Sequence, residues 1–172
     1  MDSVVVQAAA AADNPTRAQV AAAVAAVTAE RREVPLDANP ALTSLETVLV
    51  DGKPGELRLR FRATPSATQG NGVVCGGTLA SMLDTAMAMT VLSVLPAGRS
   101  CTTISLTVNM MAAAQSGHLL SQASVERAGR SVAFARAALY DADGERLLAT
   151  ATSSLALFDE RPPAPASRAA LA

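Results

Sequence analysis

The chain has 172 residues, of which 50% are hydrophobic, 17% charged and only 2% aromatic, and its formal net charge is −1. This length suffices for one domain with its own core, and the near-neutral charge without a basic run excludes nucleic acid as the main partner. No apolar stretch reaches the roughly 18 uninterrupted residues of a membrane span, so we expect no membrane partner.

The first predicted element is an N-terminal helix. The opening stretch MDSVVVQAAAAADNP places an acid where a signal peptide would carry Lys or Arg, and the two cysteines form no CxxC pair. Both observations favour a cytoplasmic protein. Asn14 and Pro15 predict the start of an Ala-rich helix that ends in basic residues. We therefore assign residues 1–33 to a leader and this helix, and residues 34–44 to a connector.

A strand hairpin and a long helix are predicted next. The runs LETVLV (45–50) and GELRLRFRA (55–63) flank Asp-Gly and Pro-Gly steps, which are typical of a turn. In the second run apolar residues alternate with arginines, as in a half-exposed strand. Residues 78–95 are too long for a strand, contain no turn residues and are apolar nearly all round, so they predict a buried helix.

Four further strands complete the predicted domain. These strand-like runs are residues 101–110, 118–127, 131–140 and 146–158. They are separated by QSG, AGR and DADG, which contain residues typical of turns. The order predicts an α+β fold over residues 34–158, in which a hairpin and an antiparallel meander wrap around one long central helix, with an extra N-terminal helix. The proline- and alanine-rich residues 159–172 predict a disordered tail.

The stretch GNGVVCGGTLASMLDTAMAM (70–89) carries the features that predict chemistry. Gly76 and Gly77 leave the first N–H groups of the helix unobstructed, which suits an anion or an oxyanion, although glycines also occur there for steric reasons. Asp84 lies among Ala, Leu and Met residues. Such surroundings suit a general base or a nucleophile, and they equally suit a buried acid bonded to backbone or hydroxyl groups.

Gly76 and Asp84 cannot act on one group from the same chain. They are eight residues apart, which on one helix corresponds to about 12 Å. If the two act together, one of them must come from a second copy of the chain across a two-fold axis.

These residues resemble the PaaI-type acyl-CoA thioesterases, a family with the hotdog fold. The family pattern is an amide residue, a glycine, His-Gly-Gly, and an acid nine residues after the His. Gln69, Gly72, Cys75-Gly76-Gly77 and Asp84 fall at that spacing. The strand-like runs after the helix also resemble those of the family, so the resemblance covers about residues 39–158.

The resemblance implies hydrolysis of an acyl-CoA or related thioester to free acid and thiol by a homodimer, which can pair into a dimer of dimers. The Gly76 N–H would polarise the thioester carbonyl, and Asp84 of the other subunit would act as nucleophile or as base for water. Gln69 would orient the substrate or water, and Thr103 matches a position that places water.

The resemblance also implies the substrate contacts. Coenzyme A belongs to the substrate, and neither a metal nor another cofactor is expected. We expect substrate contacts from three residues near the start of the helix and from two arginines that can meet the phosphates of coenzyme A: Cys75, Gly77, Asn71, Arg127 and Arg130. Solvated strand ends are an equally good interpretation of the two arginines.

Cys75 departs from the family pattern, which has His at this position. The only histidine of the chain, His118, lies on a different strand. We expect Cys75 to fill space, while a thiol at a helix N-terminus is an alternative nucleophile because its pKa is lowered. The departure also leaves open a non-catalytic acyl-CoA-binding hotdog module. A hydratase on the same fold is disfavoured, since its Asp and His pair within one short loop is missing.

Overall fold

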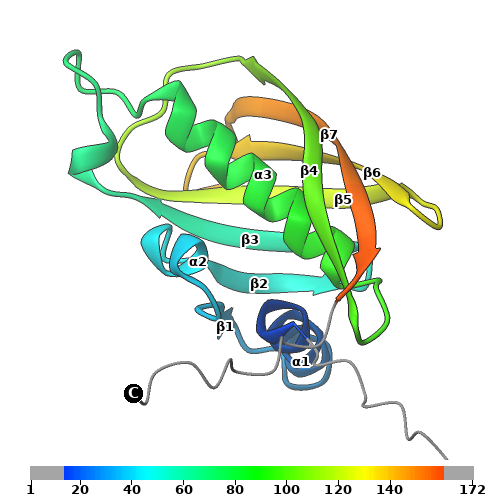
Figure 1. Ribbon diagram of the computed structural model, residues 1–172. Coiled ribbons are helices and arrows are strands. Elements are labelled where there is room, and N and C mark those ends of the chain that lie inside the picture. The colour runs from blue at the N-terminus through cyan, green and yellow to red at the C-terminus, as the bar shows by residue number, and fades with distance from the viewer. Residues whose placement is uncertain (1–13, 161–172) are drawn as a thin grey trace, which may run out of the picture.

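A single long helix is wrapped by one antiparallel sheet in the computed structural model of this chain, which describes residues 14–160 (Figure 1). The predicted leader segment 1–13 and residues 161–172 of the predicted tail lie outside the described residues. The central helix, α3 (Gly76–Leu92), buries most of its side chains, with Met82, Leu83 and Met87 fully inaccessible. This burial confirms the expectation drawn from its all-round apolar sequence.

Seven strands form the sheet: β1 (Val34–Pro35), β2 (Val48–Lys53), β3 (Glu56–Ala63), β4 (Arg99–Met110), β5 (Gly117–Ala128), β6 (Val132–Tyr140) and β7 (Leu147–Asp159). Their order across the sheet is β1-β2-β3-β5-β6-β7-β4, with every pair antiparallel. Apolar residues of the inner face pack against α3 and form one continuous core. The predicted α+β hotdog arrangement is confirmed.

The predicted four-strand meander is wrong at one position. β4 pairs with β7, at an edge of the sheet, whereas β5 pairs with β3. The chain crosses from one side of the sheet to the other through residues 111–116, so the hairpin and the later strands form one surface that covers α3 (Figure 1). Because turn sequences between neighbouring runs are compatible with either order, the sequence pattern could not reveal this crossing.

The predicted N-terminal helix is confirmed as α1 (Pro15–Glu30). The Asn14 side chain accepts hydrogen bonds from the backbone N–H groups of Thr16 and Arg17, at 2.8 and 3.4 Å, as an N-cap does. Valines on one side of α1 are buried against β2 and the end of α3. None of the helices within residues 14–160 is long and apolar enough to cross a membrane.

Two short elements were missed in the connector 34–44. They are β1 and α2 (Pro40–Ser44), whose first turn is capped by the Asn39 side chain. The central helix also begins two residues earlier and ends three residues earlier than the predicted 78–95. Gly76 therefore lies within the first turn and not ahead of it.

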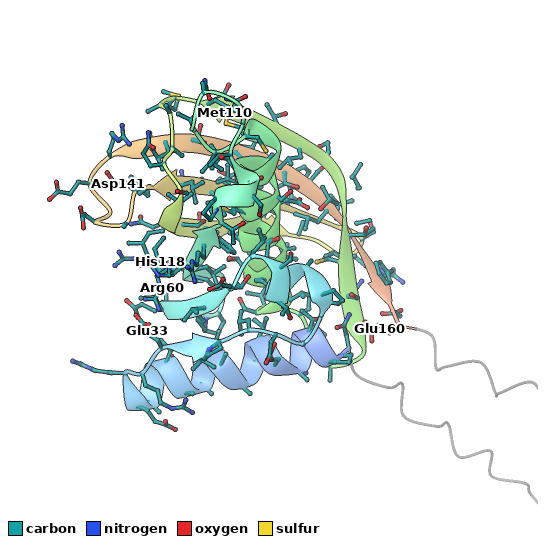
Figure 2. The ribbon with its side chains drawn as sticks, turned by 90° about the vertical axis from the view of Figure 1, so that its left-hand side faces the viewer. Glu33, Arg60, Met110, His118, Asp141 and Glu160 are labelled. Carbon is teal, nitrogen blue, oxygen red and sulfur yellow. The ribbon has the colours of Figure 1, made fainter. Side chains whose placement is uncertain are left out.

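Arginines of β3 point to the outer face of the sheet, as their alternation predicts. Arg60 donates to both carboxylate oxygens of Glu33, at 2.7 and 2.6 Å, and this pairing lowers the pKa of Glu33. His118 lies beside them on the same side of the molecule, and Met110 lies at a different end (Figure 2). Arg62 pairs with Glu46 at 3.2 Å.

Candidate active site

Asp84 meets a partner from the edge strand. Its Oδ1 accepts a hydrogen bond of 2.8 Å from the Thr103 hydroxyl of β4, and both side chains are half-buried. The sequence allowed a partner from another segment but did not identify it as Thr103. The bond fixes one carboxylate oxygen and leaves the other available to accept a proton.

The start of α3 forms a second group of candidate residues. Cys75 is the N-cap residue in extended conformation, and Gly76 and Gly77 are the first two residues of the helix. Among the described residues, no hydrogen bond is found for the Gly76 N–H. Such N–H groups at a helix start can donate to an oxyanion.

The Cys75 thiol is held at this helix start. Its Sγ lies 3.1 Å from the Thr78 hydroxyl. Chiefly this hydrogen bond, and then the nearby backbone N–H groups of Thr78 and Gly77, lower the pKa of the Cys75 thiol. The sequence-based expectation of a lowered pKa is therefore supported. Among the described residues no base accompanies the thiol, since His118 lies opposite Arg62 on the exposed outer face of β5.

The two groups of candidate residues occupy different places along α3. An added Cβ on Gly76 would lie 3.4 Å from Cε of Met110, the last residue of β4. Asp84, two turns further, faces Thr103 near the first third of the same strand. Because both residues belong to one continuous helix, the separation of about 12 Å applies, and one chain does not bring them together.

A bulge in β4 determines which of its side chains face α3. The pairing with β7 shifts between Thr103 and Ser105, which leaves Ile104 as the extra residue. Cys101 and Thr103 face the helix before the bulge, and even-numbered positions pack against the core after it, Leu106 and Val108 among them. Alternation alone would assign the second half of β4 to the wrong face, which is why the contact of Met110 with Gly76 was missed.

Gln69 and Asn71 lie in the loop that leads to α3, both exposed. The loop is closed by hydrogen bonds from the Gln69 N–H to the Val73 carbonyl and from the Cys75 N–H to the Ala67 carbonyl, at 2.8 and 2.9 Å. Both residues therefore belong to the closed loop before the helix start, and no hydrogen bond of either residue with Asp84 of the same chain is found within residues 14–160.

Arg127 and Arg130 lie near the first residue of β4, whereas the start of α3 lies near its last residue. Arg127 is close to the end of β5, and the carbonyl of Arg130 accepts a bond of 2.7 Å from the side chain of Arg99, which begins β4. Met110, beside Gly76, ends that strand, roughly 36 Å of extended chain away. Within one chain, the structure does not bring these arginines to the start of α3.

Cys101 is a further neighbour of Asp84 that sequence reasoning missed. Burial, and secondly the charge of Asp84, raise the pKa of this thiol to about 12. Its Sγ lies 3.9 Å from the carbonyl of Ala88, one turn beyond Asp84. Residues two positions apart on a strand share a face, so the position of Cys101 relative to Thr103 could have predicted this contact from the sequence.

The two thiols should differ strongly in reactivity. At neutral pH, iodoacetamide should alkylate Cys75 much faster than Cys101, because the thiolate reacts and the pKa of Cys75 is lowered whereas that of Cys101 is raised to about 12. Peptide mass spectrometry over time measures both rates, and in urea they should become similar. Faster alkylation of Cys101 in the folded protein would contradict the burial of its thiol.

Within residues 14–160, no group of three or more His, Cys, Asp and Glu side chains could hold a metal ion. The expectation that no metal or other cofactor is needed stays a prediction.

Comparisons with known proteins show which family this chain resembles. A family model of the thioesterase superfamily matches residues 71–148. A phenylacetic acid degradation-related protein of Ralstonia eutropha JMP134, described as a thioesterase, is 34% identical, with 69% of this chain and 90% of that chain covered and a TM-score of 0.65. Among curated proteins none matches.

Two more distant structures show the same fold. A thioesterase family protein of Silicibacter pomeroyi is 23% identical, with 83% of this chain and 98% of that chain covered and a TM-score of 0.67. A thioesterase protein of Streptococcus pneumoniae TIGR4, solved with coenzyme A, is 18% identical, with 66% and 86% covered and a TM-score of 0.59.

Proposed function

Because this chain belongs to the PaaI-type branch of the thioesterase superfamily and is a thioester hydrolase, we propose that it hydrolyses an acyl-CoA or related thioester through Asp84 and the Gly76 N–H. The observation that carries this proposal is the Thr103–Asp84 hydrogen bond of 2.8 Å, which holds a carboxylate on the helix whose free N-terminus can receive an oxyanion. The coenzyme A in the Streptococcus pneumoniae structure supports the choice of thiol.

In the proposed reaction, either a water molecule or the Asp84 carboxylate itself attacks the thioester carbonyl carbon. With Asp84 as base, its free oxygen takes a proton from water while the water oxygen attacks the thioester carbonyl carbon. The carbonyl oxygen becomes an oxyanion that accepts a hydrogen bond from the Gly76 N–H. When the oxyanion collapses, the C–S bond breaks, and the thiolate leaves and takes up the proton. With Asp84 as nucleophile, its oxygen attacks the carbonyl carbon, the C–S bond breaks and the thiolate leaves, and the resulting anhydride is then cleaved by water to the free acid and the Asp84 carboxylate.

The exposed edge of β4 supports the proposal of a shared site. Ile104 is 59% exposed, Met110 47% and Met111 60%, so large apolar side chains gather along an unpaired strand edge. Such an edge is a template for a second strand, and a two-fold pairing there would set Gly76 of one protomer toward Asp84 of its partner. We propose this homodimer as the active unit, with pairing of two dimers as a further step. The cytoplasmic location stays a prediction.

Thr103 positions Asp84 in this account. Replacing Thr103 with Val keeps the shape and removes the hydroxyl, so we expect kcat to fall about tenfold with KM nearly unchanged. The Thr103→Ser variant keeps the donor and should retain most of the activity. Steady-state kinetics on the three proteins measure this, and equal losses in the Val and Ser variants would assign Thr103 a packing role only.

A non-catalytic module that binds acyl-CoA is the second candidate. The observation that favours it is Cys75, which replaces the family's His and whose Sγ is engaged by Thr78. A panel of acyl-CoAs with detection of free thiol distinguishes the two. Release of coenzyme A that depends on Asp84 supports the hydrolase, and tight binding without release supports the module.

A further inference from the structure

A groove with a volume of about 1130 Å³ lies on the outer face of the sheet. Its side chains come from alternate, exposed positions of the strands, Arg58, Gln122, Arg136 and Thr152 among them. The positions between them are buried toward α3. The groove is therefore separated from Asp84 by the thickness of the sheet.

Strand pairing aligns residues of the groove, most of them polar, in two neighbouring rows. One row runs, strand by strand, through Arg58, Gln122, Ala138, Thr150 and Asn109. The second runs through Glu56, Ser124, Arg136 and Thr152. Arg58 on β3 and Arg136 on β6 lie on either side of β5, so two strand spacings of about 4.8 Å and one row separate them. Two long arginine side chains can cover this separation and reach one anionic group between them.

The charge of the groove is not balanced by its own residues. Three basic residues and two acidic ones line it, a net charge of +1: Lys53, Arg58, Arg136, Asp51 and Glu56. Lys53 pairs with Glu56 at 3.3 Å. Arg136 donates to Ser124 at 3.1 Å and lies 3.8 Å from Glu126. No ion pair of Arg58 is found among residues 14–160, whereas Arg60 and Arg62 of the same strand are both paired.

The only tyrosine of the chain lines the same groove. Tyr140 and Arg136 are four positions apart on β6, so their side chains point to the same face about 13 Å apart along the strand. This places an aromatic face at one side of the groove and guanidinium groups at the other, the two chemistries that a base and a phosphate group need.

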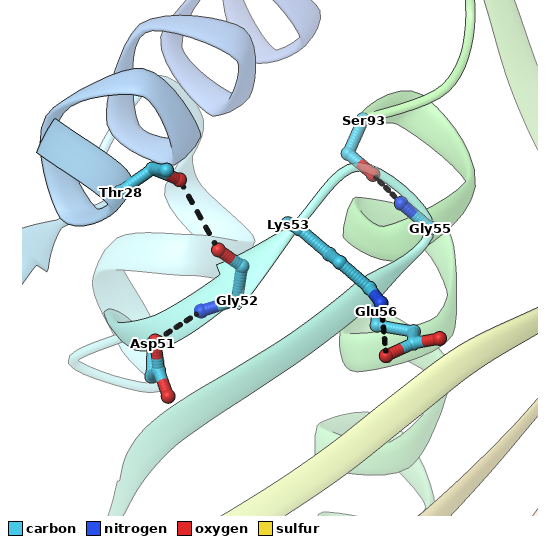
Figure 3. A network of polar contacts seen from close by, with 7 residues as sticks. All are labelled: Thr28, Asp51, Gly52, Lys53, Gly55, Glu56 and Ser93. Carbon is cyan, nitrogen blue, oxygen red and sulfur yellow. Dashed lines mark hydrogen bonds and ion pairs between the residues drawn. The ribbon is translucent and has the colours of Figure 1, made fainter.

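The β2–β3 hairpin at the rim of the groove is hydrogen-bonded to α1 and to the residue that follows α3. The hydroxyl of Thr28 in α1 donates to the Gly52 carbonyl, and the Gly55 N–H donates to Ser93 just after α3, at 3.3 and 2.8 Å (Figure 3). Asp51 caps its own turn by accepting from the Gly52 N–H. The β2–β3 hairpin is thus held in one place, so this wall of the groove is preformed.

We propose that the groove binds a nucleoside phosphate, with Arg58 and Arg136 on the phosphate and Tyr140 against the base, at a site separate from the thioester site. Free nucleotides and the nucleotide portion of coenzyme A share this chemistry. The groove lies on the face opposite Asp84, and for that reason the ligand is a separate molecule and not the bound substrate.

Calorimetric titration of the full chain with ADP tests the proposal. We expect saturable binding that Arg58→Gln and Arg136→Gln each weaken about tenfold or more, since each removes a charged donor to phosphate. The matched control is Arg62→Gln, which removes an arginine from the same strand and face but outside the groove, and it should leave ADP binding unchanged. Tyr140→Leu should weaken ADP binding and leave pyrophosphate binding unchanged.

Kinetics of thioester hydrolysis in the presence of ADP distinguish a free nucleotide from the nucleotide portion of coenzyme A as the ligand of the groove. Under the proposal, saturating ADP leaves the KM for acyl-CoA unchanged, and the Arg58→Gln variant hydrolyses thioesters at the wild-type rate. Competition between ADP and acyl-CoA that Arg58→Gln relieves would assign the groove to the substrate's own nucleotide and overturn a separate ligand. Absence of ADP binding at millimolar concentration, or binding that neither arginine affects, would also overturn it.

Discussion

Asp84→Asn should lower kcat for thioester hydrolysis by about 100- to 10,000-fold, because the amide can neither take the proton of water nor attack the carbonyl. The Thr103 hydroxyl, which donates to Asp84 Oδ1, can donate equally to the amide oxygen of Asn. We therefore expect fold, stability and thioester binding to be nearly unchanged. Turnover with an acyl-CoA and thermal unfolding measure the two effects.

Cys75→Ser is the control for this variant. It should keep most of the turnover, because the proposed nucleophile or base is Asp84 and the thiol serves to fill the helix start. Retained turnover in Asp84→Asn together with complete loss in folded Cys75→Ser would transfer the chemistry to the thiol, whose pKa is lowered by Thr78 and the helix start.

Gly76→Pro should lower kcat by about 100- to 1000-fold, the typical loss on removal of one oxyanion donor. Proline has no N–H and is well accepted at the first position of a helix. Cys75, the residue before it, already has φ −67° and ψ 144°, the extended conformation that a following proline requires. The substitution therefore removes the donor and leaves the helix in place.

Gly76→Ala is the matched control. It retains the N–H, and its Cβ would lie 3.4 Å from Met110 Cε, which is an ordinary contact with a flexible side chain. Steady-state kinetics should show near wild-type turnover for Ala and a large loss for Pro at equal helical circular dichroism. Equal losses in both variants would assign Gly76 a steric role in place of the oxyanion donor.

The sequence carried enough information to predict the fold class, because three local signals agree. The alternation in β3, the all-round apolar α3 and the Asn14 cap each determine an element without help from distant residues. The order of β4 and β5 was not predictable, since it depends on how the sheet closes around α3 and not on any local pattern.

The sequence singles out the residues of the candidate site, whose roles stay predictions, but it does not give their contacts. Asp84 and Gly76 stand out because of their neighbours along the chain, and the resemblance added Thr103. The contact of Met110 depends on the bulge at Ile104, which moves the inward face from odd to even positions, whereas Cys101 lies before the bulge on the same face as Thr103. Thr103 and Ser105 lie on either side of the bulged Ile104, and none of these three residue types marks a bulge in a sequence.

The most direct test of the shared site is to mix the two inactive variants, Asp84→Asn and Gly76→Pro, and to measure turnover after their subunits have exchanged. A hybrid dimer would hold one site with wild-type Gly76 from one protomer and wild-type Asp84 from its partner. Half of the dimers would be hybrids with one intact site of two, so the account predicts recovery to about a quarter of wild-type activity. Hybrid dimers that form without any gain in turnover would contradict a site built from two chains.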